Sequence, residues 1–370
     1  MAPLAVTTET PLTIRGVRTR TVEVPMTYVL GTSAAIIRSA SLLLVDVETE
    51  EGVSGRSYVF CVRPRGPRFV AEVLADAAEI VKGERVAPAE IANLLAKRFL
   101  LIGVTGVVRM ALSALDAALW DAFAIAAGMP LATLLGGKPK RIPAYNSNGL
   151  GLMGPEATAQ EALKLLEGGF KAVKLRLGYP TLEQDVATTR AVRRAIPDDV
   201  ALPVDFNQAL SVAEALRRGH ALQGEGILWI EEPIRHDDYA GNAALARELR
   251  VPIQIGENFN GPQAMAEALA AEACDLVMPD LARIGGVTGW MHAAGLAAAR
   301  GVPMSSHLFP ETSAHLLAVT PTAHFLEYVD WANAVVREPL KIEDGCAVVP
   351  DRPGCGLVWD EKAVEKYRVT

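Results

Sequence analysis

Three acidic residues stand at the same point of a pattern that repeats in the middle of the chain. The stretch 202–257 contains LPVDFN, LWIEEP and IQIGEN, and each short apolar run ends in a carboxylate, namely Asp205, Glu231 or Glu257. Both intervals between these acids are 26 residues long, and each contains a segment with helical periodicity. Because a parallel crossover needs a helix and two short loops, this period predicts a repeated βα unit.

The repetition also predicts that the three acids converge. In a closed parallel barrel all strands end at one rim, so side chains at equivalent strand ends meet there. A single acid at a strand end is more often a turn or cap residue, but three in phase favour a shared role. Three adjacent carboxylates repel one another, and a divalent cation neutralises them. Since the ligands are oxygens without a nearby Cys or His, Mg²⁺ is favoured over zinc.

The 370 residues exceed what one hydrophobic core normally fills, so we expect one large and one smaller domain. Residues 13–62 contain three strand-like runs, which predict an antiparallel meander. The connection 25–39 between the first two runs is long for a hairpin, and we interpret it as a functional loop. Helical periodicity follows over 68–137, so residues 1–140 are expected to form an α+β capping domain.

From residue 141 the chain alternates between strand and helix. Eight short runs resemble strands: IPAYNS, FKAVKLRLG, ALPVDF, ILWIEE, PIQIGE, CDLVMPD, VPMSSH and HFLE. We therefore expect a catalytic α/β barrel over 141–332. Hairpin-like material and a short helix follow, and we expect 333–370 to fold back on the capping domain.

The charge and hydropathy of the sequence exclude some classes of binding partner. The net charge of −7 argues against nucleic acid or an anionic membrane surface. The sequence contains no run of about 18 uncharged apolar residues, which is the length needed to span a bilayer. Its N-terminal residues do not resemble a secretory signal. The four cysteines are scattered without metal-ligand spacing, as expected of reduced thiols. These features predict a soluble, cytoplasmic protein.

The strand FKAVKLRLG predicts two cations inside the barrel. Its alternation places Lys174 and Arg176 on one face, whereas Val173, Leu175 and Leu177 share the other. The apolar face belongs against the surrounding helices. Two inward cations are costly unless anions or a substrate balance them, so we interpret both as site residues.

Later strand ends add an acid–base pair. Asp280 and His307 end successive strands and are expected to meet, which would orient the imidazole as a general base. The other five histidines do not stand at equivalent strand ends and are interpreted as structural or surface residues. Glu327 ends the last strand, Ser147 closes the first, and Asn207 follows Asp205 at i+2.

This constellation resembles the enolase superfamily, specifically its mandelate racemase group. The resemblance covers nearly the whole chain and includes ALSALDAALWDAFAIAAGMPLATLLGG, VDFNQ, WIEEP, GEN, MPDLARIGGVTGW and SSHLFPETSAHLLAVTPTAHFLE. It implies a modified TIM barrel, (β/α)7β, with an α+β cap, and a symmetric homo-oligomer.

The resemblance also implies roles for the site residues. Mg²⁺ would be held by Asp205, Glu231 and Glu257 and would bind the carboxylate of a small-molecule substrate. Lys174 and Ser147 would contact that carboxylate, and Glu327 would donate a hydrogen bond to it. Preset charges and hydrogen bonds of this kind stabilise an enolate formed by removal of an α-proton. Arg283 resembles the family's basic residue at that position and is expected to tune the Asp280/His307 pair.

One position departs from the family pattern. Members that abstract a proton from both faces of the substrate typically carry Lys-x-Lys, whereas this chain has Arg176 in the second place. Guanidinium groups rarely act as bases near neutral pH. We therefore favour a one-base enzyme in which His307 takes the α-proton and then protonates a leaving β-hydroxyl, which is a dehydratase.

Two alternatives stay open at this stage. Overall likeness to the group supports a racemase or epimerase of a 2-hydroxy acid. An apolar loop over 29–39 and Tyr58 favour an aryl or alkyl distal group on the substrate, which weakens the dehydratase interpretation, although Arg38 could face a polar group. A non-catalytic relative should have lost ligands, and here all three acids and the Asp280/His307 pair are present.

Overall fold

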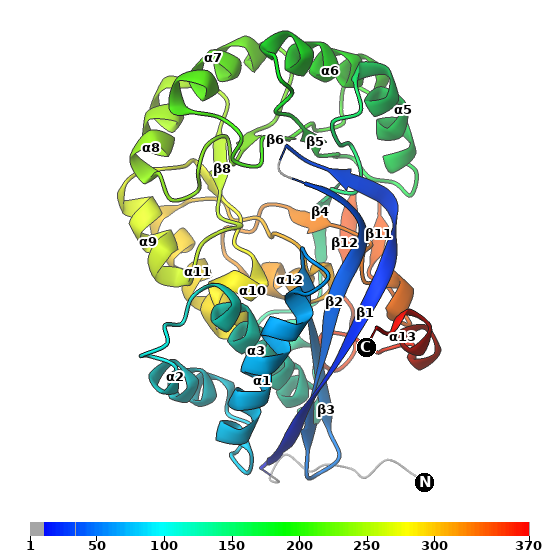
Figure 1. The fold of residues 1–370 in the computed structure, drawn as a ribbon, viewed down its shortest axis with the longest axis vertical. Coiled ribbons are helices and arrows are strands. Elements are labelled where there is room, and N and C mark those ends of the chain that lie inside the picture. The colour runs from blue at the N-terminus through cyan, green and yellow to red at the C-terminus, as the bar shows by residue number, and fades with distance from the viewer. Residues whose placement is uncertain (1–10, 34, 370) are drawn as a thin grey trace.

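The computed structural model describes residues 11–33 and 35–369 and shows an open antiparallel sheet beside a ring of parallel strands (Figure 1). The open sheet has the order β1–β2–β3, with β1 at Ile14–Gly31, β2 at Ile36–Thr49 and β3 at Ser54–Cys61. The capping helices are α1 (Gly66–Val81), α2 (Pro88–Arg98), α3 (Gly106–Ala126) and α4 (Leu131–Leu134). Helix α3 packs against β3 on one side and against the barrel helices α10 and α11 on the other, so it joins the two parts.

Two buried acids explain the motif ALSALDAALWDAF in α3. Asp116 accepts hydrogen bonds from the backbone N of Thr288 at 2.9 Å and from its hydroxyl at 2.5 Å. Asp121 accepts from the backbone N of Arg56 at 2.8 Å and of Cys355 at 2.6 Å. Burial raises the pKa of Asp116 to about 7 and that of Asp121 to about 6. These carboxylates therefore connect the helix to the barrel, to the capping sheet and to the C-terminal segment.

The barrel closes where its last strand pairs with its first. Its strands are β4 (Arg141–Asn146), β5 (Leu175–Arg176), β6 (Val204–Asp205), β7 (Ile230–Glu231), β8 (Ile253–Ile255), β9 (Leu276–Val277) and β10 (Leu326–Tyr328). Strand β10 pairs in parallel with β4, and bridges at Val173 and Met304 complete the ring. The expected strand VPMSSH is thus present only as single bridges, at Met304 and at His307.

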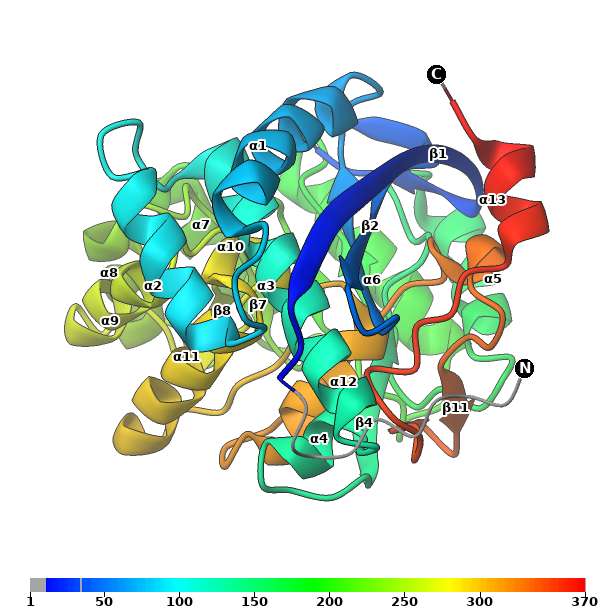
Figure 2. The same cartoon turned by 90° about the horizontal axis from the view of Figure 1, so that it is seen from below.

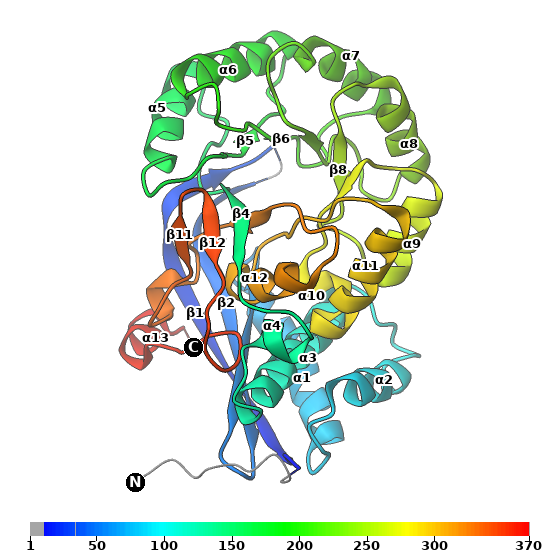
Figure 3. The same cartoon turned by 180° about the vertical axis from the view of Figure 1, so that it is seen from behind.

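Helices surround this ring on the outside (Figure 3). They are α5 (Pro155–Leu165), α6 (Leu182–Ala195), α7 (Val212–Leu222), α8 (Tyr239–Glu248), α9 (Pro262–Ala270), α10 (Leu281–Ile284), α11 (Gly286–Arg300) and α12 (Pro310–Val319). None of the helices in the described part of the chain combines the length and apolarity that crossing a membrane requires.

Alternating inward side chains stack in layers inside the barrel. One buried layer is mainly apolar and consists of Tyr145, Ala172, Trp229 and Leu276. The rings of Tyr145 and Trp229 lie 5.6 Å apart, edge to face. Because inward positions recur every second residue, Ser147, Lys174 and Glu231 form the next layer toward the rim. A packed apolar floor therefore lies directly beneath the polar residues.

The connection expected as a functional loop over 25–39 is instead mostly strand. Strands β1 and β2 continue pairing through Leu30 with Ile37 and Gly31 with Ile36, after an irregularity that follows Pro25. The resulting hairpin reaches from the capping sheet to the barrel rim (Figure 1). The run is strand because its residues pair across the sheet, and only alternate side chains such as Leu30 and Ile37 face the cavity, whereas Val29 and Ile36 are exposed.

The C-terminal segment contacts both parts of the molecule. After η1 (Asn333–Val335), β11 (Lys341–Glu343) and β12 (Cys346–Val348) form a hairpin that pairs with β4 of the barrel. Helix α13 (Glu361–Tyr367) instead lies against β1 of the cap, as the view from below shows (Figure 2). The contacts with the capping domain are made by α13 and by residues 354–359, since Cys355 donates to Asp121 and Trp359 to Asp46, whereas the hairpin extends the barrel sheet.

A buried histidine predicts that acid weakens the fold. His315 in α12 accepts a hydrogen bond from the backbone N of Ala132 through Nδ1 at 3.2 Å, and burial lowers its pKa to about 4. The unfolded chain binds this proton from about pH 6.5 downward, whereas the folded chain resists it to about pH 4. The free energy of unfolding should therefore fall by about 3 kcal/mol between these values. Urea unfolding at pH 7 and 4.5 should show a smaller fall for His315→Gln than for the exposed control His292→Gln.

Candidate active site

A cavity of about 800 Å³ lies between the hairpin tip and the barrel rim. Its polar lining contains Lys174, Arg176, Asp205, Asn207, Gln208, Glu257, Arg283, His307 and Glu327. Its apolar lining contains Leu30, Ala35, Ile37, Phe60, Val62, Leu308 and Trp331. The barrel thus supplies the charged groups, and the cap supplies much of the apolar wall.

Lys174 lies at the centre of a buried cluster of acids. Its Nζ is 3.3 Å from Asp205, 2.6 Å from Glu231 and 2.7 Å from Glu327, and all four side chains are almost fully buried. Burial alone would lower the pKa of Lys174, but the three carboxylates raise it above its ordinary value. Lys174 is therefore a fixed cation, and its predicted inward orientation is correct.

The pKa values of Glu231 and Glu327 shift in opposite directions, although both carboxylates contact Lys174. Burial, reinforced by the charges of Asp205 and Glu327, raises the pKa of Glu231 to about 8 against the effect of Lys174. Although burial also opposes ionisation of Glu327, Lys174 and His307 lower the pKa of that carboxyl to about 2. Glu327 accepts from the Ser147 hydroxyl at 2.7 Å and from the backbone N of Leu308 at 2.8 Å. The Glu327 carboxylate is therefore a hydrogen-bond acceptor in this arrangement. To donate a hydrogen bond to the substrate, as expected from the sequence, it would have to be protonated, and its lowered pKa disfavours that.

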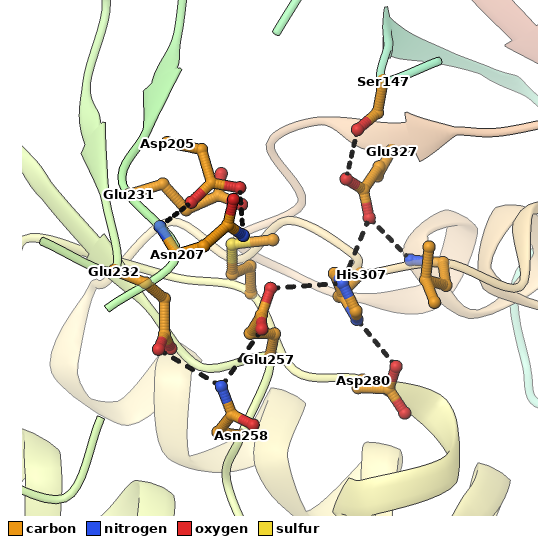
Figure 4. Close-up of polar contacts among 12 residues, drawn as sticks. Ser147, Asp205, Asn207, Glu231, Glu232, Glu257, Asn258, Asp280, His307 and Glu327 are labelled. Atoms are coloured by element: carbon orange, nitrogen blue, oxygen red, sulfur yellow. Dashed lines mark hydrogen bonds and ion pairs between the residues drawn. The ribbon is translucent and has the colours of Figure 1, made fainter. Parts of the chain in front are cut away.

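His307 and Asp280 form the predicted pair. Nδ1 of His307 lies 2.7 Å from Oδ2 of Asp280, while its Nε2 faces the cavity 3.2 Å from Glu257 and 3.8 Å from Glu327 (Figure 4). Asp280 also caps α10 by accepting from two backbone N–H groups, so its carboxylate is held in place. Burial opposes protonation, but Glu257, Glu327 and Asp280 together raise the pKa of His307 to about 9. The geometry is that of an oriented imidazole whose Nε2 points at the cavity beside Glu257.

The third acid of the repeat lies further along the chain than equal spacing suggests. Asp205 pairs in register with Glu231, but Glu231 pairs with Gln254, so Glu257 follows three residues later. Gly256 has φ of 140°, and a Cβ there would stand 2.8 Å from the backbone N of Met278. The chain turns at this glycine, and Glu257 extends from a loop rather than from a strand end.

Two residues missed by the sequence analysis support this loop. Glu232 is fully buried and accepts from the backbone N of Gly256 and from Asn258 Nδ2, each at 3.2 Å (Figure 4). Asn258 also donates to Glu257 at 3.1 Å. Burial and the charge of Glu257 raise the pKa of Glu232 well above its ordinary value. The doubled acid in WIEEP was the available signal for this second carboxylate.

Arg283 supports the same loop by donating to the carbonyl of Glu257 at 2.9 Å. It contacts the Asp280/His307 pair only through its backbone N, which donates to Asp280.

Arg176 is bound to the loop that follows β4. Its guanidinium donates to the carbonyl of Gly149 at 2.6 Å, and to the carbonyl and hydroxyl of Ser147 at 2.9 and 3.2 Å. The side chain is almost fully buried and still borders the cavity. It thus positions the segment that carries Ser147, a role that its place in the motif did not reveal.

The remaining predicted residues divide into two groups. Asn207 borders the cavity and donates to Asp205 through both its backbone N and its side chain, at 2.7 and 3.0 Å. Tyr58 is buried and outside the cavity lining, because its hydroxyl donates to Glu311 at 2.9 Å. Phe60, two residues later on the same face, borders the cavity in its place and packs on Trp331. Arg38 is exposed and does not border the cavity.

The chemistry of the site suits a hard divalent cation. Within residues 11–33 and 35–369, no three His, Cys, Asp or Glu side chains are gathered closely enough to hold an ion; Asp205 and Glu231 pair with Lys174, and Glu257 faces His307. The donors are nevertheless all oxygens and their negative charge exceeds that of Lys174. In addition, the buried Oδ1 of Asn207 lacks a partner in the described part of the chain. Excess buried carboxylates and an orphaned amide oxygen fit Mg²⁺.

A glycine contact predicts how the hairpin tip is seated. A Cβ on Gly151 would stand 2.6 to 3.0 Å from three backbone atoms of Gly31, and Ser33 Oγ donates to the carbonyl of Phe206 at 3.0 Å. Gly151→Ala should push the tip off the rim, since backbone atoms cannot yield as a flexible side chain does. We expect kcat/KM to fall by about tenfold, mainly through a higher KM. Gly16→Ala, where the added methyl meets no atom within 4 Å, is the control and should match the parent protein.

The comparisons with known proteins place this site in a family. Residues 157–363 match the enolase C-terminal domain-like family, and residues 14–136 match the N-terminal domain of the mandelate racemase / muconate lactonizing enzyme family. The chain belongs to the mandelate racemase group of the enolase superfamily. The modified barrel with its α+β cap, expected from the sequence, is confirmed by neighbours of this superfamily.

Solved structures of the superfamily contain magnesium. An enolase from alpha proteobacterium BAL199 with bound magnesium is 47% identical over 97% of this chain and 100% of its own, with a TM-score of 0.95. A Bradyrhizobium enolase complexed with magnesium and mandelic acid is 42% identical over 98% of this chain and 100% of its own, with a TM-score of 0.93. Among characterised relatives, the L-talarate/galactarate dehydratase of Salmonella typhimurium is 30% identical over 88% of this chain and 82% of its own. The relatives are enzymes, and the family uses magnesium with more than one reaction outcome.

Proposed function

We propose that this chain is a magnesium-dependent enzyme that removes the α-proton of a 2-hydroxy carboxylate from one face, with His307 as the base. The observation that carries the proposal is the contrast between His307 and Arg176. His307 presents Nε2 to the cavity, 3.2 Å from Glu257, and is oriented by Asp280, whereas the guanidinium of Arg176 donates to two loop carbonyls. A group committed to carbonyl acceptors cannot accept a proton, so the second face of the substrate lacks this base.

The cation would be held by Asp205, Glu231 and Glu257, with Asn207 beside them. When bound, it neutralises these carboxylates and stabilises negative charge on the substrate. Lys174 stays protonated and offers a second positive charge to the enolate, since its neighbours keep its pKa raised. Ser147 is held by Arg176 and Glu327, so its hydroxyl is fixed before the substrate binds.

The favoured reaction is dehydration of an acid with a β-hydroxyl. His307 takes the α-proton, and the C–O bond at the β-carbon then breaks. The hydroxyl leaves as water with the proton that His307 returns, and the resulting enol tautomerises to a 2-oxo acid. One base serves both steps, in agreement with the single oriented imidazole at the site.

A racemase is the second candidate. Its support is the apolar wall formed by Leu30, Ile37 and Phe60, which suits an aryl or alkyl group, together with the mandelic acid in the Bradyrhizobium structure. A panel of mandelate, alkyl 2-hydroxy acids and 2,3-dihydroxy acids, followed by proton NMR, separates the candidates. Loss of water supports the dehydratase, and inversion without loss of water supports the racemase.

Two substitutions of Arg176 test its role. Arg176→Met should lower stability by about 1–3 kcal/mol, because buried loop carbonyls lose their donors, and should not open the second face. Arg176→Lys supplies an amine whose pKa can fall beside other cations, so slow exchange at the second face should appear. Thermal unfolding and NMR in D₂O measure the two effects. Exchange at the second face in the parent protein, abolished by Arg176→Met, would show that Arg176 is a base.

A further inference from the structure

A second cavity, of about 390 Å³, opens between the cap and the barrel, away from the active site. It is bordered by α2, α3 and the turn after α10, which lie together in Figure 1. Its lining consists of Ile91, Ala92, Leu95, Ala96, Val104, Arg109, Leu112, Ser113, Asp116 and Gly285. None of these residues borders the active-site cavity.

Arg109 brings an uncompensated positive charge to this cavity. Its side chain is largely buried, and no residue of the described chain accepts a hydrogen bond or forms an ion pair with its guanidinium. Burial lowers its pKa, and no carboxylate lies close enough to offset that effect. A guanidinium that is partly withdrawn from water gains from an anionic partner, because desolvation of an unpaired charge is costly.

The one acid in the lining does not neutralise Arg109. Asp116 directs its carboxylate to the backbone N and hydroxyl of Thr288 at the start of α11. The hydroxyl of Ser113 likewise donates to the backbone carbonyl of Arg109 within α3. The donors of Arg109 are therefore free, whereas both carboxylate oxygens of Asp116 already accept hydrogen bonds from Thr288.

Two glycines leave room for the guanidinium. A Cβ on Gly261 would stand 3.0 Å from Nη2 of Arg109, and a Cβ on Gly285 would stand 3.6 Å from Nη1. The planar group thus rests against the backbone of two barrel loops. Opposite it, Ile91 and Leu95 of α2 contribute apolar walls.

We propose that this cavity is a binding site for a small organic carboxylate with a short apolar chain. The carboxylate pairs with the guanidinium of Arg109, and the chain packs between α2 and α3. Carboxylates bind guanidinium groups through two parallel hydrogen bonds, which an inorganic halide cannot reproduce. The inference does not depend on the proposed function of the active site.

The location can be tested with 4-bromobutyrate soaked into crystals of the full chain. We expect an anomalous bromine peak between α2, α3 and Gly285. A peak confined to the cavity lined by Lys174 and His307 would overturn the proposal.

Calorimetry with butyrate tests the same site in solution. Arg109→Gln should weaken binding by about tenfold or more, because a charge-assisted pair is lost. Ala92→Leu should block the cavity without removing the charge and weaken binding similarly. Arg98→Gln, at an exposed arginine of α2, should leave the affinity unchanged. Parental affinity in both Arg109→Gln and Ala92→Leu would place butyrate at another site and contradict the proposal.

Discussion

Replacing His307 with asparagine should reduce α-proton exchange by about 10⁴-fold, the upper end of what general acid–base catalysis contributes. Asparagine preserves the polarity and approximate size of the side chain but cannot accept a proton from carbon. The Asp280 carboxylate keeps its bonds to the first turn of α10, so the local backbone should survive the change. Proton NMR in D₂O with any acid that the parent protein exchanges provides the measurement.

The matched control is His292→Asn, an exposed histidine on α11 that should retain the parental rate. Magnesium affinity of His307→Asn, measured by calorimetry, should not weaken, because the imidazole is not among the proposed ligands. Exchange at the parental rate in His307→Asn would remove His307 from the role of base.

Removal of magnesium should have an effect of similar size. Chelated protein should lose turnover by roughly 10³-fold or more, since electrostatic stabilisation of the developing charge is lost, and added Mg²⁺ should restore it. Glu257→Gln should show the same loss together with weaker Mg²⁺ binding. Its carboxylate faces the cavity and is not needed by the barrel core.

Glu248→Gln, at an exposed acid that ends α8, is the control for Glu257→Gln and should behave as the parent protein. If chelated protein turned over at the parental rate, the metal assignment would be wrong. If chelation stopped turnover but Glu257→Gln did not, the cation would be held by other carboxylates, with Glu232 the nearest candidate.

The repeat of acids predicted the barrel because strand period and helix length leave a local signature in the chain. The inward orientation of Lys174 followed from the same alternation, and the His307 pair with Asp280 followed from successive strand ends. The position of Glu257 did not, because Gly256 turns the chain before that acid. An equal spacing in residues does not guarantee an equal register in a barrel.

Contacts between distant segments were harder to predict. The hydroxyl of Tyr58 donates to Glu311, which lies 253 residues away in the chain. Phe60, and not Tyr58, therefore lines the cavity. The guanidinium of Arg176 is held by carbonyls of a loop whose path depends on a left-handed Gly149, with φ of 58°. Side-chain pattern reports which face a residue occupies, but it does not report which backbone atoms meet it there.

Single-face proton abstraction is tested most directly by incubating the unmodified protein in D₂O with each enantiomer of an acid that it turns over. The rate of α-deuterium incorporation is then measured by NMR. We predict that only the enantiomer whose α-hydrogen faces Nε2 of His307 incorporates deuterium, and that the other is inert. Comparable incorporation into both enantiomers, with racemisation, would contradict the one-base account and show that a second base acts opposite His307.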